Sequence, residues 1–209
     1  MSAAETKARV LDAALASFGR RGYEATSLDA VAAVSGVRKQ TILYHFGGKE
    51  HLLEAVIDRS ADELAEALER ALRVSAQRAA TEAGEARPVD GWDRVEAVVR
   101  SVFRLAARRP EVLGLVREVS RLGPPHADRL MKQLEPLVVR ATSFLEAEMR
   151  GGALRAQDPR LVLMAAYSIV VGFATEVEVQ RALGYAAGPR AAVRRRAQLL
   201  DFLHSALVG

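Results

Sequence analysis

The stretch from Thr26 to Phe46 constrains the fold of this chain more than any other part of the sequence. It opens with an apolar stripe at helical spacing, formed by Leu28, Val31 and Ala32. Such a stripe predicts a short amphipathic helix that needs a neighbour to cover it. Gly36 follows, and a glycine directly after a helical segment commonly adopts the left-handed conformation that ends a helix. The chain restarts at Arg38, so the stretch predicts two short helices joined by a glycine turn.

The second of these helices has two unlike faces when its residues are spaced at about 100°. Ile42 and Phe46 share one face, with His45 at its edge. The opposite face carries Lys39, Gln40, Leu43 and Tyr44. A cation, an amide, an apolar tip and a phenol provide the phosphate anchors, base-edge hydrogen bonds and thymine-methyl contact that reading a DNA major groove requires. Two short helices around a glycine turn match the helix-turn-helix, so double-stranded DNA is the expected partner.

An extended motif surrounds this stretch. Its residues are Gly22, Tyr23, Thr26, Ser27, Leu28, Val31, Ala32, Ser35, Gly36, Val37, Thr41, Ile42, Tyr44, His45, Phe46, Lys49, Glu50, Leu52 and Leu53. This pattern resembles the DNA-binding domain of the tetracycline-repressor (TetR) family over roughly residues 5 to 55. The resemblance implies a homodimeric repressor that a small molecule releases from a palindromic operator. One departure is Arg38, which stands where the family usually has a serine or threonine N-cap, so the second helix should start with a weaker cap.

The expected DNA contacts divide into two kinds. Gln40 and Lys39 are predicted to discriminate bases, and Leu43 to touch a thymine methyl. Phosphate anchors are expected at Thr26, Thr41, Tyr44 and Lys49, and Arg38 and His45 complete the predicted DNA-binding set. Thr26 is also expected to cap the helix that follows it.

Composition narrows the class of protein. The 209 residues are 50% hydrophobic, which is ample for a buried core, and the net charge of +4 is modest. With no cysteine, disulfides, thiol catalysis and cysteine-bound zinc are excluded. No secretory signal and no apolar run long enough to span a bilayer occur, so a cytoplasmic protein without membrane contact is expected. Catalytic, cofactor-binding and metal-binding motifs are absent, so neither an enzyme nor a cofactor nor a metal is predicted.

Helical patterns fill the whole chain, which predicts an all-α fold with two domains. A three-helix DNA-binding domain is expected over residues 1–48, its first helix at 5–20, and a larger ligand-binding and dimerisation domain over 49–209. A long helix should run from Lys49 to about residue 80, and its first part alone would measure roughly 37 Å at 1.5 Å per residue. Residues 81–91 are the linker-like stretch. Further helices are expected at 91–107, 110–122, 126–150, 158–175 and 189–208.

The last two helices are the expected dimer interface. Residues 161–175 are apolar all round, which a surface helix cannot be unless it buries more than one face. Small residues at Ala165, Ser168 and Gly172 would let another helix approach closely. In the TetR family the last two helices pair with their copies, which implies interface positions at Ala165, Ser168, Gly172, Leu200, Leu203 and Leu207. A monomeric core is the alternative.

Large side chains in the C-terminal helices suggest an apolar cavity for the effector. The candidates are Trp92, Phe103, Met131, Phe144, Met164, Tyr167 and Phe173. Side chains of this kind more often form core than pocket. The alternative function is therefore a constitutive or activating DNA-binding protein whose C-terminal domain only dimerises.

Overall fold

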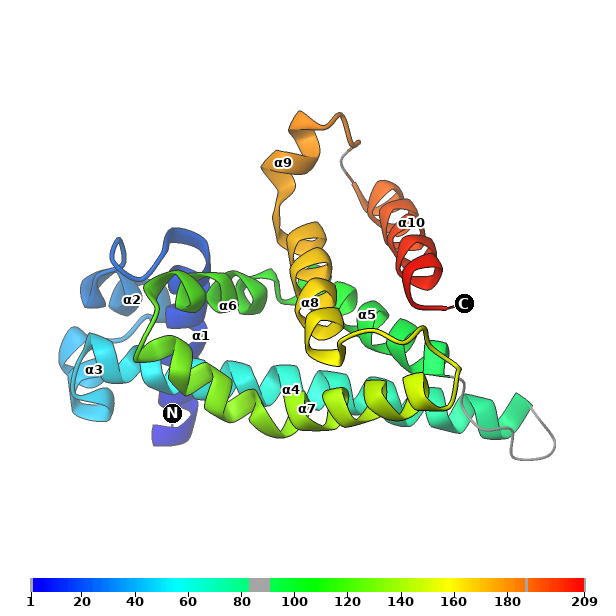
Figure 1. Ribbon diagram of the computed structural model, residues 1–209. Helices are drawn as coiled ribbons and strands as arrows, with labels where there is room; N and C mark the ends of the chain where they lie inside the picture. The colour runs from blue at the N-terminus through cyan, green and yellow to red at the C-terminus, as the bar shows by residue number, and fades with distance from the viewer. Residues whose placement is uncertain (1, 83–90, 187, 209) are drawn as a thin grey trace. The chain divides into compact units, whose positions relative to one another are not determined.

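The computed structural model describes residues 2–82, 91–186 and 188–208, in which all regular structure is helical (Figure 1). The ten helices of these ranges are α1 (Ala3–Arg21), α2 (Leu28–Ser35), α3 (Lys39–Phe46), α4 (Lys49–Glu82), α5 (Gly91–Arg108), α6 (Pro110–Leu122), α7 (His126–Arg150), α8 (Pro159–Thr175), α9 (Val177–Ala182) and α10 (Pro189–Leu207). The predicted all-α class is confirmed. Most of the expected linker, residues 83–90, lies outside the described residues. No described helix combines the length and the apolarity needed to cross a bilayer.

The first helix begins earlier than the sequence predicted, because a capping box precedes it. The Ser2 hydroxyl accepts from the Glu5 N–H (3.1 Å), and the Glu5 carboxylate accepts from the Ser2 N–H (2.8 Å). These two bonds satisfy N–H groups that have no partner within the helix. α1 ends at Arg21, and Gly22, the C-cap that follows, has a positive φ of 87°.

The chain forms two compact units. The first comprises Met1–Leu64 and Arg109–Glu135, and the second Ala65–Arg108 and Pro136–Gly209. α4 and α7 each contribute residues to both units. The domain boundary expected after residue 48 stays a prediction; in the first compact unit, the helix-turn-helix segment is joined by the first part of α4, by α6 and by the start of α7.

Helices α1 and α6 pack extensively against each other within the first unit. Two glycines face each other across this contact. A Cβ added at Gly19 would collide with the carbonyl oxygen of Glu111, and a Cβ added at Gly114 would collide with the carbonyl oxygen of Gly19. The two backbones therefore touch directly, and only glycine fits at either position.

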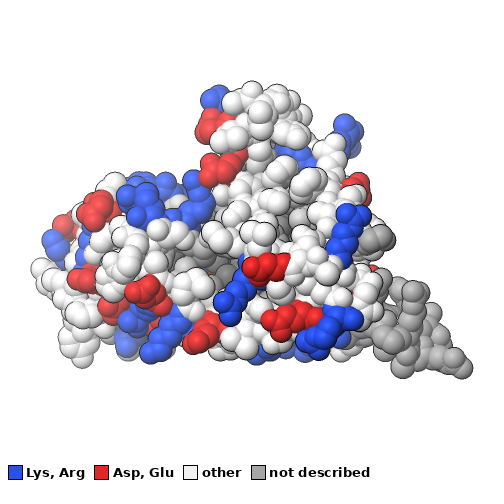
Figure 2. Space-filling view, in the orientation of Figure 1, with Lys and Arg blue, Asp and Glu red and all other residues white. Residues whose placement is uncertain are grey.

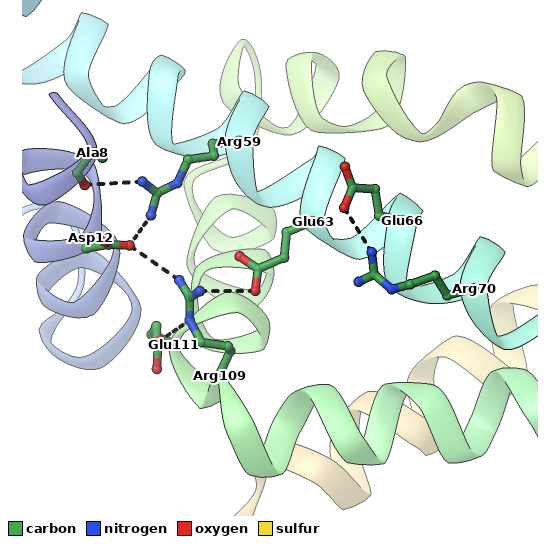
Figure 3. Close-up of polar contacts among 8 residues, drawn as sticks. All are labelled: Ala8, Asp12, Arg59, Glu63, Glu66, Arg70, Arg109 and Glu111. Carbon is green, nitrogen blue, oxygen red and sulfur yellow. Dashed lines mark hydrogen bonds and ion pairs between the residues drawn. The ribbon is translucent and has the colours of Figure 1, made fainter. Parts of the chain in front are cut away.

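Two arginines link α1 to its neighbours in the first unit (Figure 3). Arg59 lies in α4, and Arg109 directly precedes α6. Arg59 of α4 donates to the carbonyl of Ala8 (3.2 Å) and also pairs with Asp12. Arg109 pairs with three acids: Asp12 (3.6 Å), Glu63 (3.2 Å) and Glu111 (2.7 Å). Because Asp12 is shared by both arginines, α1 is tied to α4 and to the start of α6 at a single point.

The second unit is built on α5, which packs against both α8 and α10. Its buried residues form two clusters. One contains Val99, Val170, Leu199, Leu200 and Leu203, and the other Leu145, Leu154, Val162 and Leu207. Helix α9 was not predicted: it has six residues, too few for an apolar repeat, and the side chain of its buried Gln180 donates to the Phe173 carbonyl (2.7 Å).

Candidate nucleic-acid interface

The turn between α2 and α3 has the geometry that its glycine permits. α2 ends at Gly36, whose φ of 66° and ψ of 30° are left-handed, and whose N–H donates to the carbonyl of Ala32. The N–H of Val37 donates to the same carbonyl (3.2 Å). α3 then starts after Arg38, whose side chain makes no capping hydrogen bond, as predicted. The helix-glycine-helix arrangement expected from the sequence is present.

Helix α3 has one buried and one exposed side. Ile42 is fully buried and Phe46 is half-buried. The exposed side chains are Arg38, Gln40, Leu43 (39% exposed) and Tyr44 (85% exposed). Thr41 and His45 are half-buried between these two sides. A phenol as exposed as that of Tyr44 contributes nothing to the core of this chain and is available to a partner.

Lys39, the first residue of α3, is paired with an acid from α2. Its ammonium lies 2.8 Å from a carboxylate oxygen of Asp29, and both side chains are exposed. An exposed ion pair of this kind contributes about 0–1 kcal/mol, so it can open when a phosphate or a base edge competes for the lysine. The pair sets the position of the Lys39 ammonium in the free chain.

Lys49, the first residue of α4, is held against the turn between α1 and α2. Its ammonium lies 4.2 Å from the centroid of the Tyr23 ring and donates to the carbonyl of Glu24 (3.5 Å). Burial, with smaller contributions from the charges of Glu50 and Glu24, raises the pKa of the Tyr23 phenol. The ring therefore stays neutral at physiological pH beneath the ammonium.

The capping role expected of Thr26 is wrong. The N-cap of α2 is Ser27, whose hydroxyl accepts from the Ala30 N–H (3.1 Å). Thr26 is 1% exposed, and its hydroxyl donates to the carbonyl of Gly22 (2.8 Å). Adjacent Thr and Ser residues are both good caps, and the side chain one residue later is the one that lies outside the core. The phosphate contact predicted for Thr26 is untested, and its buried hydroxyl does not favour it.

Two polar contacts at this interface involve residues that sequence reasoning did not assign to the site. Asp29 was left unassigned because its partner Lys39 lies on the next helix, and helical periodicity does not predict contacts between helices. Tyr23 belongs to the extended motif but had no role there. A cation directly after a helix-ending glycine pair, as Lys49 is, gives no indication that an aromatic ring lies beneath it.

The seven side chains predicted to line an effector site do not form one group. Four are partly buried against the clusters of the second unit: Trp92, Phe103, Phe144 and Phe173. Trp92 packs against both clusters and lies edge-on to His204, with ring centroids 4.8 Å apart. Met164 (70% exposed) and Tyr167 lie on the exposed side of α8. Met131 is exposed too and belongs to the first unit.

The six residues predicted at a dimer interface also fall into two sets. Leu200, Leu203 and Leu207 are buried in the clusters of the second unit, so the single chain already covers them. Ala165 and Ser168 are exposed, and a Cβ added at Gly172 would meet nothing within 4 Å. Val193, in the apolar repeat of α10, is 56% exposed.

Comparison with known proteins agrees with the resemblance seen in the sequence. The model of the family described as "Bacterial regulatory proteins, tetR family" matches residues 10–56, from within α1 into α4. The HTH-type transcriptional activator FasR of Mycolicibacterium smegmatis is 37% identical over 80% of this chain and 69% of its own length. An HTH-type transcriptional repressor of Streptomyces coelicolor is 27% identical over 79% of each chain.

A solved structure shows that the likeness extends to the fold. The crystal structure of a transcriptional regulator from Streptomyces coelicolor aligns with a TM-score of 0.72 at 23% identity, covering 97% of this chain and 98% of that chain. The family model falls on the helix-glycine-helix segment and the helices that flank it. The chain therefore belongs to the TetR family, and it is a DNA-binding transcriptional regulator, not an enzyme.

Proposed function

We propose that this TetR-family regulator binds a palindromic operator as a homodimer and represses transcription until an apolar small molecule releases it. The observation that carries the DNA-binding part is the outer side of α3, where Gln40, Leu43 and Tyr44 are exposed while Ile42 is buried. A helix held in this way by its neighbours can enter the major groove without any rearrangement of the core.

The proposed contacts follow from exposure and chemistry. Gln40 can make the bidentate hydrogen bonds that recognise adenine, and Leu43 beside it can contact a thymine methyl. Lys39 contributes base contacts once it leaves Asp29. Phosphate contacts are assigned to Arg38, Thr41, Tyr44, His45 and Lys49.

Association is proposed through the exposed apolar side chains of α8 and α10. They are Leu161, Met164, Tyr167, Val193 and Phe202. Small residues at Ala165, Ser168 and Gly172 lie on the same side of α8 as Leu161, at helical spacing, and would let a second copy approach closely. An exposed apolar surface of this kind marks an interaction site in a soluble protein. Two-fold symmetry would present two copies of α3 to a palindrome.

An apolar effector is supported by the partly buried aromatic rings of the second unit. Trp92 packs against both buried clusters, with Phe103 and Phe173 against one and Phe144 against the other. Rings that line an apolar region and are not fully buried suit a site for a small apolar molecule. The guanidinium of Arg94, 5.2 Å from the centroid of Phe144, adds one charged group to this region.

The proposed link between effector and DNA is α4. It starts at Lys49, separated from the end of α3 by two residues, and continues without a break to Glu82. Its 34 residues are divided between the two units. Two copies of α3 must stand about 34–36 Å apart to occupy successive major grooves. A small tilt of α4 would change that spacing and oppose DNA binding by a coupling free energy of typically about 1–3 kcal/mol, which acts equally in both directions.

The experiment that tests this function has two stages. A DNase footprint on the DNA upstream of the protein's own coding sequence, with and without extracted metabolites, identifies an operator and a releasing compound together. Calorimetric titration of that compound with and without operator then tests the link. Reciprocity requires operator DNA to weaken the compound's binding by the same factor as the compound weakens operator binding. Equal affinities in the two titrations contradict the proposed mechanism.

Activation is the second candidate, because FasR, the relative at 37% identity, is named an activator. In that case the C-terminal helices would serve only to form the dimer, and transcription would rise when the protein binds its operator. In vitro transcription from the footprinted promoter decides between the two signs: repression lowers transcript yield as protein is added, and activation raises it.

A further inference from the structure

A carboxylate from α6 holds the turn between α1 and α2. Glu118 accepts a hydrogen bond from the Tyr23 backbone N–H (2.7 Å), although 95 residues separate the two in sequence. Its side chain is 10% exposed, and Arg121 donates to both of its oxygens (2.9 and 2.8 Å). Arg121, above all, and then the Tyr23 N–H hold the pKa of Glu118 below its usual range, so the carboxylate is charged at physiological pH.

The turn that Glu118 holds is the support of Lys49. The Tyr23 ring lies under the Lys49 ammonium (4.2 Å), and the next residue, Glu24, accepts a hydrogen bond from it (3.5 Å). The Tyr23 ring also lies close to Phe18 and His126, with ring centroids 5.5 and 6.1 Å away. These neighbours contact the ring, whereas the hydrogen bond to Glu118 holds the Tyr23 backbone.

We propose that Glu118 is a positioning residue for DNA binding, which keeps the Gly22–Glu24 turn, and through it the Lys49 ammonium, in place to meet a phosphate. The inference rests on the proposed phosphate contact of Lys49. It assigns to α6, which carries none of the proposed DNA contacts, a defined effect on one of them.

The sign of the expected effect separates positioning from plain electrostatics. Removing a negative charge near DNA strengthens binding if only charge matters, because acids repel phosphates. Loss of positioning weakens binding, because the Lys49 ammonium then lies less often beside the phosphate that it would neutralise. Figure 2 shows Lys and Arg side chains gathered over α6, the helix with the exposed Arg117 and Arg121, so the charge of Glu118 is already balanced locally.

Two conservative substitutions separate the effect of the Glu118 charge from the effect of the position of its acceptor oxygen. Glu118→Asp keeps the charge but withdraws the acceptor by about 1.5 Å, one carbon–carbon bond. Glu118→Gln loses the charge but keeps an oxygen at the same distance from the Tyr23 N–H. If Glu118 acts by position, Glu118→Asp impairs DNA binding and Glu118→Gln largely preserves it. Both substitutions change the side chain by little, and circular dichroism at the assay temperature verifies folding.

The experiment measures the affinity of the full chain for a duplex that wild-type protein selects from a random pool, over a series of salt concentrations. Glu118→Asp should lower the magnitude of the salt slope by about 1 per bound protomer, as Lys49→Met should. In a Lys49→Met background, Glu118→Asp should have no further effect on the slope. Glu146→Ala, which removes an exposed acid from α7, serves as the matched control and should leave the slope unchanged.

The outcomes are distinguishable. If Lys49→Met lowers the slope and Glu118→Asp does not, the positioning role is refuted and the proposed Lys49 contact stands. If the two substitutions are additive, Glu118 acts by a route other than Lys49 and the inference is also overturned. If Lys49→Met leaves the slope unchanged, both the proposed contact and the inference built on it fail.

Discussion

The ammonium of Lys39 at the start of α3 lies 2.8 Å from a carboxylate oxygen of Asp29 in α2. In the proposed complex, α3 of this TetR-family regulator meets the major groove with its first cation already paired with an acid. DNA then has to replace that acid before Lys39 can contribute, and both side chains are exposed enough for the exchange to cost little.

The first prediction is that Asp29→Asn strengthens binding to non-cognate DNA and reduces discrimination. Freeing Lys39 for phosphate should raise the magnitude of the salt slope by about 1 per protomer. The comparison is fluorescence anisotropy on a cognate and a scrambled duplex over a salt series. Asp62→Asn, at an exposed acid of α4, is the control. If Asp29→Asn has the same effect in a Lys39→Met background, the pair is not the cause.

The second prediction concerns base recognition by Gln40. Its exposed amide suits bidentate hydrogen bonds to a single base, so Gln40→Ala should cost about 1–3 kcal/mol at one position of the site and leave the others unchanged. Binding-site selection with wild type and variant measures this directly. An identical selected sequence for both would remove Gln40 from the base-reading set.

The third prediction tests association. A Cβ at Gly172 meets nothing within 4 Å, so Gly172→Leu should not disturb the fold of the single chain. If α8 packs closely against a second copy, the added side chain costs about 1–3 kcal/mol through overpacking at that interface. Sedimentation should then show a shift from dimer to monomer with an unchanged circular dichroism spectrum. A variant that stays dimeric and binds DNA normally places the interface elsewhere.

The fourth prediction is a loss of stability in acid. Arg129, through its hydrogen bonds, holds the pKa of Asp58 below its usual range, and Arg121 does the same for Glu118. Lowered folded-state pKa values mean that the unfolded chain binds more protons. These contributions are therefore complete above about pH 4.5 and are lost as pH falls through the folded-state values. Urea midpoints between pH 6 and pH 3 should fall less steeply for Asp58→Asn. An identical decline would contradict the assignment.

The fifth prediction contrasts two glycines. Gly19→Ala places a methyl group against the backbone carbonyl of Glu111 and should destabilise the chain by about 1–3 kcal/mol or more. Gly172→Ala has free space inside a helix and should stabilise the single chain by up to about 1 kcal/mol. Thermal unfolding of both variants at a protein concentration low enough to exclude association gives the comparison. Equal effects of the two substitutions would show that α1 and α6 separate easily.

Local signals predicted the parts of this fold that depend on neighbours in sequence. The buried side of Ile42 and the exposed side of Gln40 follow from helical spacing, and the left-handed Gly36 follows from the end of the apolar stripe. The cap of α2 was predicted one residue too early, at Thr26, because Thr26 and Ser27 are chemically similar until the core buries one of them.

Contacts between distant segments could not be predicted in this way. Nothing in the periodicity of α6 indicates that it packs on α1 and not on its neighbours in sequence, because an apolar stripe specifies burial but no partner. For the same reason, the hydrogen bond between the Tyr23 N–H and Glu118 could not be predicted from the sequence. Leu200, Leu203 and Leu207 are buried within the single chain, and periodicity alone does not distinguish such burial from burial between two chains.

The direct backbone contact between Gly19 and Gly114 bears on how regulators of this kind can be recombined. An exchange of DNA-binding segments that is cut near the end of the family match, residue 56, would transplant α1 without α6. The recipient's own α6 would then have to offer a glycine at the crossing point, or the graft would meet a side chain where only backbone fits. For this chain, the transferable module comprises α1 to α3, the first part of α4, and α6. A chimera that specifies both glycines as a matched pair should retain the donor's DNA specificity.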